Sequence, residues 1–352
     1  MTRNMRLLAS ASVLAATAVA ASPAFAAGTT AGTSVTNTVT LDYKIGTVDQ
    51  NQVTASDTFV VDRKVNLSVS EVGTTTTTVT PGQTGAVTTF SVSNASNAPL
   101  DFAVAASQLS GGTAAHGGTD KFDVTGVKVY ADTNANGGYD PGTDLEITFL
   151  DQVAADTSRT VFVVADVPLG RVTGDVAGVR LTATASEATA VGTLGATVTQ
   201  TSGANTAGVD TVFADTNANN NVARDGIHFA EDDYTILAAS LVATKTSRVV
   251  SDPFNGTTNP KMIPGAVVEY CISVANGSGS ATASGINISD ALPPETSYDS
   301  AFGIKLNGTV TGTTCNADGT AGGSYGAGIV SGTLTDIAAG VTRTLVFRVS
   351  VK

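Results

Sequence analysis

The feature that most constrains the fold is a strand pattern that occurs twice in the chain. The first copy follows Pro81-Gly82 and ends at Asn94, and one of its sides would carry Ala86, Thr88, Phe90 and Val92. The second copy follows Pro264-Gly265 and ends at Asn276, and the corresponding side would carry Val268, Tyr270, Ile272 and Val274. A period of two is typical of half-buried strands, because successive side chains of a strand point to opposite faces. The repetition predicts two related β-domains.

The two copies also end alike, and the composition suits strands. Asp151-Gln-Val-Ala-Ala-Asp-Thr-Ser-Arg-Thr-Val-Phe in the first copy is matched by Asp336-Ile-Ala-Ala-Gly-Val-Thr-Arg-Thr-Leu-Val-Phe in the second. There are 37 Gly, aromatic residues make up 5% and Trp is absent, which disfavours long amphipathic helices. Short strands separated by Gly, Pro and Asn turns predict an all-β chain of sandwiches.

The N-terminus has the three parts of a secretory signal peptide. Arg3 and Arg6 form a basic start, residues 7–21 are apolar, and Ala24-Phe-Ala26 places small residues at the cleavage site. We therefore predict residues 1–26 as a cleaved signal peptide, and the protein as secreted or located at the cell surface. No later stretch is long and apolar enough for a transmembrane segment.

The rest of the chain divides into four parts. We expect a β-hairpin segment at 27–64, a first β-sandwich repeat at 65–190, an acidic Asn/Gly-rich connecting region at 191–240 and a second β-sandwich repeat at 241–352. The hairpin segment contains an unusually regular strand at 34–45 and a second run at 53–61. We expect these strands to complete the first sandwich of the same chain. The alternative is donation to the sheet edge of a neighbouring copy, which would propagate into a filament.

Three segments of the second copy resemble a known family. They are Pro264-Gly265, the strand Tyr270–Asn276, and Asp290-Ala-Leu-Pro-Pro-Glu-Thr-Ser-Tyr298. They are similar to the bacterial surface conserved repeat domain, also called domain of unknown function 11. Glu295 stands where that family usually has Gly, and Cys271 is not part of the pattern. The resemblance implies tandem immunoglobulin-like β-sandwiches in an exported cell-surface protein, and it implies no activity.

The net charge and the small number of potential catalytic residues argue against two classes of function. The chain has 18 Lys and Arg against 30 Asp and Glu, and its net charge of −12 argues against a nucleic-acid partner. Gly322-Gly-Ser-Tyr-Gly326 matches a nucleophile motif, but it lies in a Gly-rich segment and no His follows His228. His116 and His228 are expected to be loop residues. We therefore predict no enzymatic activity.

One Asp/Asn-rich segment has the spacing of a calcium loop. Carboxylate and amide oxygens recur at alternate positions around glycines, as hard cations require. The candidate ligands are Asp132, Asn134, Asn136, Gly138, Asp140 and Asp144. The acidic residue expected at the twelfth position is replaced by Thr143, and no flanking helices are expected, so a calcium loop on a β-scaffold is predicted rather than an EF-hand. The alternative is a hairpin turn with solvated side chains.

A second segment repeats the first half of that pattern. Its candidate ligands are Asp215, Asn217, Asn219 and Asp225. Asn220 stands where the first segment has Gly, and Ala223 replaces the ligand at the ninth position. An irregular acidic loop is therefore preferred here to a cation site.

Cys271 and Cys315 are the only two cysteines, and both lie in the second repeat. Cysteines of exported proteins pair by default in an oxidising compartment. Cys271 is out of phase with the apolar side of its strand, so the bridge is expected to fasten the Gly-rich segment 310–328 to the outer face of the sheet.

The preferred function is an exported, non-enzymatic structural or adhesive cell-surface protein, with calcium as a predicted stabilising cofactor. Its partners would be other cell-surface components or copies of itself. A polysaccharide-binding module is the rival hypothesis, although the absence of Trp removes the usual aromatic platform. A subunit of a surface filament assembled by strand donation is the other alternative.

Overall fold

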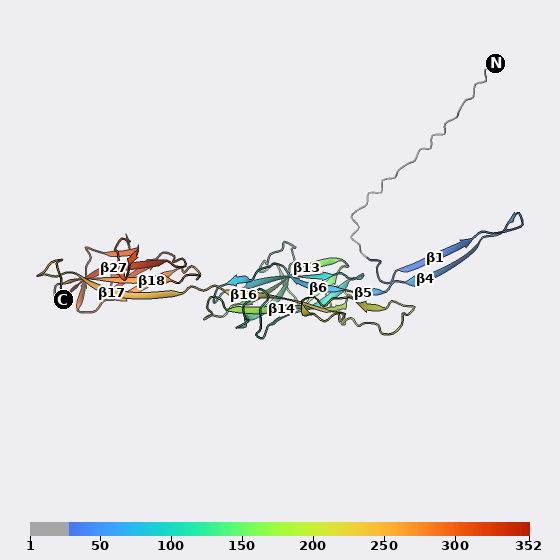
Figure 1. Cartoon of the computed structure of the whole chain (residues 1–352), viewed down its shortest axis with the longest axis horizontal. Helices are drawn as coiled ribbons and strands as arrows, with labels where there is room; N and C mark the ends of the chain where they lie inside the picture. Colours follow the sequence, from blue (N-terminus) through green and yellow to red (C-terminus); the bar gives the residue numbers. More distant parts are fainter. Residues whose placement is uncertain (1–27) are drawn as a thin grey trace, which may run out of the picture.

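The computed structural model describes residues 28–352, so the predicted signal peptide at 1–26 lies outside the described residues. Figure 1 shows three bodies in a row: a projecting β-hairpin, a first sandwich and a second sandwich. Among the described residues the only helix is one 3-10 turn, η1 (Ala218–Asn220), and the prediction of an all-β chain is confirmed. None of the helices in residues 28–352 is long and apolar enough to cross a bilayer.

The first sandwich consists of two five-stranded sheets. One has the order β11 (Leu145–Glu146), β10 (Thr125–Ala131), β13 (Thr157–Asp166), β8 (Ala86–Asn94) and β6 (Leu67–Glu71). The other has the order β12 (Phe149–Val153), β9 (Leu100–Gln108), β14 (Val176–Glu187), β16 (Ile227–Ile236) and β7 (Thr77–Val79). A short parallel pair, β5 (Arg63–Val65) and β15 (Thr211–Phe213), lies beside them.

This strand order is that of an immunoglobulin-like sandwich. In that fold, strands A, B, E and D form one sheet and strands C, F and G form the other. Here β6, β8, β13 and β10 occupy the first four positions, and β9, β14 and β16 occupy the other three. The side chains that fill the space between the sheets are apolar and almost fully buried, among them Phe90, Phe102, Leu181 and Val161.

The second sandwich repeats part of this arrangement. Its larger sheet has the order β17 (Leu241–Ser251), β18 (Val267–Asn276), β27 (Thr342–Val351), β21 (Ile304–Gly308) and β24 (Thr320–Ala321), with β20 (Thr296–Tyr298) also paired to β27. Its smaller sheet has the order β19 (Ile286–Ala291), β26 (Ile329–Leu334) and β25 (Ser324–Gly326). A short hairpin of β22 (Val310–Thr311) and β23 (Thr314–Cys315) carries the second cysteine.

Two buried asparagines show that the repeat seen in the sequence is a repeat in the fold. The Nδ2 atom of Asn94 donates to the carbonyl oxygens of Ala98 and Val153. At the corresponding end of β18, Nδ2 of Asn276 donates to the carbonyl oxygens of Ala281 and Ile337. Each amide satisfies loop carbonyls that are removed from water, which is the usual reason for a buried Asn. Strand B therefore ends in the same way in both domains.

The first domain is longer than we expected. The predicted connecting region at 191–240 contains β16, and this strand pairs along its whole length with β14. The acidic run at 231–233, which suggested a loop, lies within β16, and Asp232 and Asp233 are buried. The boundary expected at 191 is therefore too early, and it lies after β16.

The expectation that the N-terminal strands complete the first sandwich is wrong. β1 (Ser34–Leu41) and β4 (Val53–Val60) form a two-stranded sheet of their own. Two short strands, β2 (Lys44–Ile45) and β3 (Val48–Asp49), close the tip. The base is fastened to the first domain by Asn97, whose Nδ2 donates to the carbonyl oxygens of Thr29 and Asp62 at 3.0 and 2.9 Å. The hairpin therefore projects from the sandwich (Figure 1).

Candidate functional site

The predicted calcium ligands gather in one loop between β10 and β11. Nδ2 of Asn134 and Nδ2 of Asn136 donate to Oδ2 of Asp140 at 2.8 and 2.6 Å. These two amides hold the pKa of Asp140 below its usual range. Asp132 accepts from the backbone N–H of Gly137, and the backbone N–H of Gly138 donates to Oδ1 of Asn136. The loop is thus closed by its own side chains.

The same loop is anchored at its end by a buried carboxylate. Asp144 accepts from the backbone N–H of Thr133 at 2.9 Å and from that of Asp140 at 2.7 Å. The donor set fits a hard cation, provided that the amides of Asn134 and Asn136 turn their oxygens toward it. Calcium binding at this loop stays a prediction.

The weaker candidate segment uses its acids as turn-forming acceptors. Asp215 is buried and accepts from the backbone N–H groups of Asp225 and Gly226 at 3.2 and 3.1 Å. Asp225 in turn accepts from the backbone N–H of Ile227. Asn217 directly precedes η1 and Asn219 lies within it. Only the two acids are therefore brought together.

Sequence reasoning missed a partly buried acidic cluster around His116. Nε2 of His116 lies 3.1 Å from Oε2 of Glu71, and its Nδ1 lies 3.7 Å from Oδ1 of Asp232. Burial raises the pKa of Asp232 to about 7. The backbone N–H of His116 donates to Oδ2 of the fully buried Asp233. One ligand atom from each of Glu71, His116 and Asp232 lies within 4.8 Å of the others, so the cluster could hold a divalent cation.

No sequence signal marks that cluster, because its members come from β6, β16 and the loop between β9 and β10. His228, expected in a loop, is a core residue of β16. Its Nδ1 accepts from the backbone N–H of Val69 at 3.0 Å, and burial lowers its pKa.

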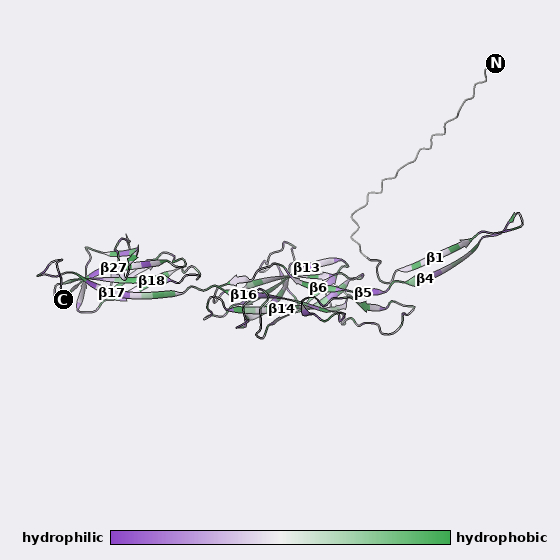
Figure 2. Cartoon of the chain, viewed as in Figure 1, coloured by the Kyte–Doolittle hydropathy of each residue, from purple (hydrophilic) through white to green (hydrophobic). Residues whose placement is uncertain are grey.

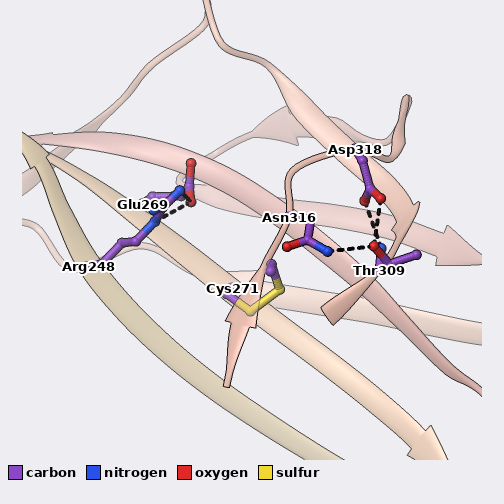
Figure 3. The surroundings of a disulfide bond; sticks show 7 residues. Arg248, Glu269, Cys271, Thr309, Asn316 and Asp318 are labelled. Carbon is purple, nitrogen blue, oxygen red and sulfur yellow. Dashed lines mark hydrogen bonds and ion pairs between the residues drawn. A yellow bond between two sulfur atoms is a disulfide. The ribbon is translucent and has the colours of Figure 1, made fainter. Parts of the chain in front are cut away.

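The structure contains the predicted disulfide between Cys271 and Cys315, whose Cα atoms are 5.7 Å apart. It fastens the β22–β23 hairpin to the outer face of β18, as the alternation of β18 indicated (Figure 3). Beside it, the buried Glu269 is held by Arg248 on one side and Arg348 on the other. Asp318 accepts from the backbone N–H and hydroxyl of Thr309, which fixes the loop (Figure 3). The bridge is typical of an oxidising compartment.

One face of the β1–β4 hairpin is an exposed surface to which the fold assigns no role. Its odd-numbered side chains lie on one side, and they are Val35, Asn37, Val39, Leu41, Val53, Ala55, Asp57 and Phe59. Val39 is 63% exposed and Phe59 is 60% exposed. Figure 2 shows hydrophobic segments along both strands where they project beyond the first sandwich. Contiguous exposed apolar side chains mark interaction sites.

The opposite face of the hairpin is polar. It carries Ser34, Thr36, Thr38 and Thr40 from β1, with Thr54, Ser56, Thr58 and one apolar residue, Val60, from β4. The hydroxyls of Thr36 and Thr58 are hydrogen-bonded across the strands at 2.8 Å. Within residues 28–352, β1 and β4 pair only with each other, so each strand has a free edge. An isolated two-stranded hairpin is marginally stable in water.

Comparison with known proteins yields only weak structural similarity. No family model and no curated protein matches the chain. The crystal structure of the class 5 fimbriae chaperone CfaA is 6% identical, with a TM-score of 0.23 over 78% of this chain and 83% of that chain. The collagen adhesin (CNA) from S. aureus is 13% identical, with a TM-score of 0.21 over 83% and 84%. A putative membrane anchored protein from Corynebacterium diphtheriae is 12% identical, with a TM-score of 0.21 over 91% and 89%. These values assign the chain to no family.

Proposed function

We propose that this protein is a non-enzymatic structural component of a bacterial cell surface that assembles with copies of itself by donating the β1–β4 hairpin. The observation that carries the proposal is the hairpin itself, which has an exposed apolar face, a polar face and two free edges. An extended segment binds a sheet edge through main-chain hydrogen bonds, and its alternate side chains enter the partner's core. The hairpin offers both: free main-chain edges for hydrogen bonding, and apolar side chains at alternate positions.

The arrangement of the domains makes such an assembly a chain. The hairpin and the second sandwich lie at opposite ends of the first sandwich (Figure 1). Donation of a segment at one end to a surface elsewhere on the next copy is a heterologous contact, and heterologous contacts continue unless they close into a ring. The expected product is a filament of sandwiches in series.

Location at the surface is supported by three features. They are the predicted signal peptide at 1–26, the Cys271–Cys315 disulfide and the resemblance of the second repeat to the bacterial surface conserved repeat domain. A series of sandwiches would act as a spacer or an adhesive surface, and its function would need no catalytic centre.

The test is the assembly state of the purified chain from residue 27. Light scattering and electron microscopy over a range of concentrations should show oligomers that lengthen as concentration rises. The variant V39S/F59S, which removes two large side chains from the apolar face, should stay monomeric and folded. The matched control T38S/T58S changes the polar face and should assemble like the wild type. A wild-type protein that is monomeric at high concentration, or a V39S/F59S variant that still assembles, would overturn the proposal.

A further inference from the structure

Residues 241–352 contain no counterpart of two strands that the first domain has. In the first domain, β9 pairs with β12 on one side and with β14 on the other, and β16 continues the sheet. In the second domain, β19 corresponds to β9 and pairs with β26 as β9 pairs with β12. The other edge of β19 has no partner among residues 28–352. The positions of β14 and β16, strands F and G, therefore have no counterpart among the described residues of the second domain.

Strand A is more exposed in the second domain than in the first, as expected if no F and G strands cover it. The pairing of Leu67 with Asn94 on β6–β8 corresponds to the pairing of Leu241 with Asn276 on β17–β18. Leu67 is 1% exposed, whereas Leu241 is 45% exposed. The inner face of strand A is covered by the F–G sheet in the first domain and is uncovered in the second.

The free hairpin matches the missing pair of strands in sequence and in pairing. Ala55-Ser-Asp57-Thr-Phe59 on β4 has the pattern of Ala230-Glu-Asp232-Asp-Tyr234 on β16. In the hairpin Ala55 pairs with Val39, and in the first domain Ala230 pairs with Leu181. In both cases these residues lie on the apolar side. The pattern of Ala, Asp and an aromatic residue at alternate positions could have been found from the sequence alone.

The backbone N–H and C=O groups of the hairpin also point in the same directions as those of the β14–β16 pair. In β14, the N–H of the core-facing Ala185 donates to the carbonyl oxygen of Gly226, the residue directly before β16. In the hairpin, the odd-numbered Thr33 accepts at its carbonyl from the N–H of Val61, so the apolar side of β1 directs its backbone groups toward β4. With its apolar side facing a core, β1 therefore takes the place of β14 and β4 that of β16. The even-numbered Thr residues of β1 then offer their backbone groups to strand C.

The edge of β19 offers the complementary groups. The N–H of Leu292 donates to the carbonyl of Gly328, on the side of β26, at 2.8 Å. Backbone groups alternate in direction along a strand, so those of Asn287, Ser289 and Ala291 point away from β26. The residues at the corresponding positions of β9 are those whose backbone groups point toward β14. Both strands of the new pair thus present free donors and acceptors at matching positions.

Charge favours the same register. If β4 takes the place of β16, Asp57 takes the place of Asp232, which lies beside Glu71 on strand A. The residue at the position of Glu71 in the second domain is Lys245, which pairs with Ile272 as Glu71 pairs with Phe90. Lys245 now contacts Asp290 of β19 at 2.7 Å. The uncovered face of the second domain therefore carries a cation at the place where the donated hairpin brings a carboxylate.

We propose that the β1–β4 hairpin of one copy completes the second sandwich of another copy as its strands F and G, with β1 antiparallel to β19 and Thr40 opposite Ser289. This inference rests on the proposed function and names the acceptor. The donor is a second copy, because the hairpin of the same chain lies beyond the far end of the first sandwich (Figure 1). Thr40 takes the place of Thr182, because Val39 takes that of Leu181. Ser289 takes the place of Ala105, because Ile286 pairs with Leu334 as Phe102 pairs with Leu150. Thr182 pairs with Ala105 in the first domain, and this pairing sets the register.

Cross-linking between two variant chains tests the register. One chain carries Thr40→Cys and the other carries Ser289→Cys, and both keep the native disulfide. Directly opposed residues of antiparallel strands have Cα atoms about 5.5 Å apart, within the range for a disulfide. Mild oxidation of the mixture should yield covalent dimers. The matched control is Ser56→Cys, on the same polar face but on β4, one strand farther from β19, and it should yield at least tenfold fewer.

The outcomes separate this inference from the proposed function. Dimers from Thr40→Cys but not from Ser56→Cys support it. Filaments that form while Thr40→Cys gives no more dimers than Ser56→Cys overturn this acceptor and leave the proposed function standing. Absence of assembly by the wild type overturns both.

Discussion

At the scale of the residue, several structural roles in this fold belong to buried polar side chains, although the chain has few charged residues. Asn94 and Asn276 hold equivalent loops in the two domains. The first domain buries Asp232, Asp233 and His228 in a single strand. Such residues interrupt the apolar alternation on which a sequence-based assignment depends, because burial of a charge is unfavourable unless partners are present. Those partners, such as His116, lie far away in sequence.

Asp232 should make the first domain less stable as the pH rises from about 4 to 7. Its folded-state pKa of about 7 lies above the ordinary value of 3.8, so within this window the folded state holds a proton that the unfolded chain has lost. Glu71 and His116 face the same carboxyl group, and Asp233 lies on the other side of His116 close enough for its charge to raise the pKa of Asp232 further. The variant D232N should have a flatter dependence of the melting temperature on pH, measured with a chelator present. Wild type and D232N with equal slopes between pH 4 and 7 would contradict this assignment.

Asp57 should contribute to assembly through its charge. Against Lys245 of a second copy, D57K replaces attraction by repulsion, and we expect the dissociation constant to rise at least tenfold, which corresponds to about 1.4 kcal/mol. The control D49K makes the same change of charge at the exposed hairpin tip, beside Lys44, and should have less than a twofold effect. Sedimentation at low salt measures both, and equal behaviour of the two variants would argue against the Lys245 contact.

At the scale of the element, the sequence predicted strands and turns well and their partners poorly. The regular run at 34–45 covers β1 and the short β2, the run at 53–61 corresponds to β4, and both Pro-Gly turns precede a strand B. The same runs did not reveal that the hairpin stands apart, because alternation identifies an apolar face and not the core that it enters. β16 was assigned to a connecting region because its acids are typical of loops. A long connecting segment separates it from its partner β14 along the chain.

The Asp/Asn loop between β10 and β11 should bind calcium. A ligand that binds only the folded state raises the melting temperature by mass action, so millimolar Ca²⁺ should stabilise the first domain by several degrees. The double variant D132A/D140A should lose most of that gain. Calorimetry with Ca²⁺, and with Mg²⁺ for comparison, measures the shift. If the wild type melts at the same temperature with and without Ca²⁺, the loop is a turn closed by its own side chains.

At the scale of the whole molecule, the two sandwiches are separate cores joined by one crossing of the chain. The buried clusters of the first domain contain residues from Val65 to Ile236, and those of the second contain residues from Val268 to Val349. This division followed from the repeat. The uncovered apolar face within residues 241–352 did not, because it becomes visible only when one domain is compared with the other in register.

Reduction of the Cys271–Cys315 disulfide should therefore affect one domain alone. The bridge closes a loop of 44 residues, for which the chain-entropy model gives about 4 kcal/mol of stabilisation. Reduced protein, or the C271S/C315S variant, should show a lower melting transition for the second domain and an unchanged transition for the first. Differential scanning calorimetry separates the two. A joint shift of both transitions would show that the domains unfold as one unit.

The position of the hairpin determines how an assembled chain would carry load. Both ends of the hairpin join the first domain at its base, so tension along the molecule pulls β1 and β4 lengthwise. In the proposed filament, the hydrogen bonds between β1 and β19 lie across the direction of pull. Force would then act in shear on the whole row of bonds at once, rather than peeling them apart one by one. A junction made without any covalent link between subunits would thereby resist stretching most strongly along the filament axis.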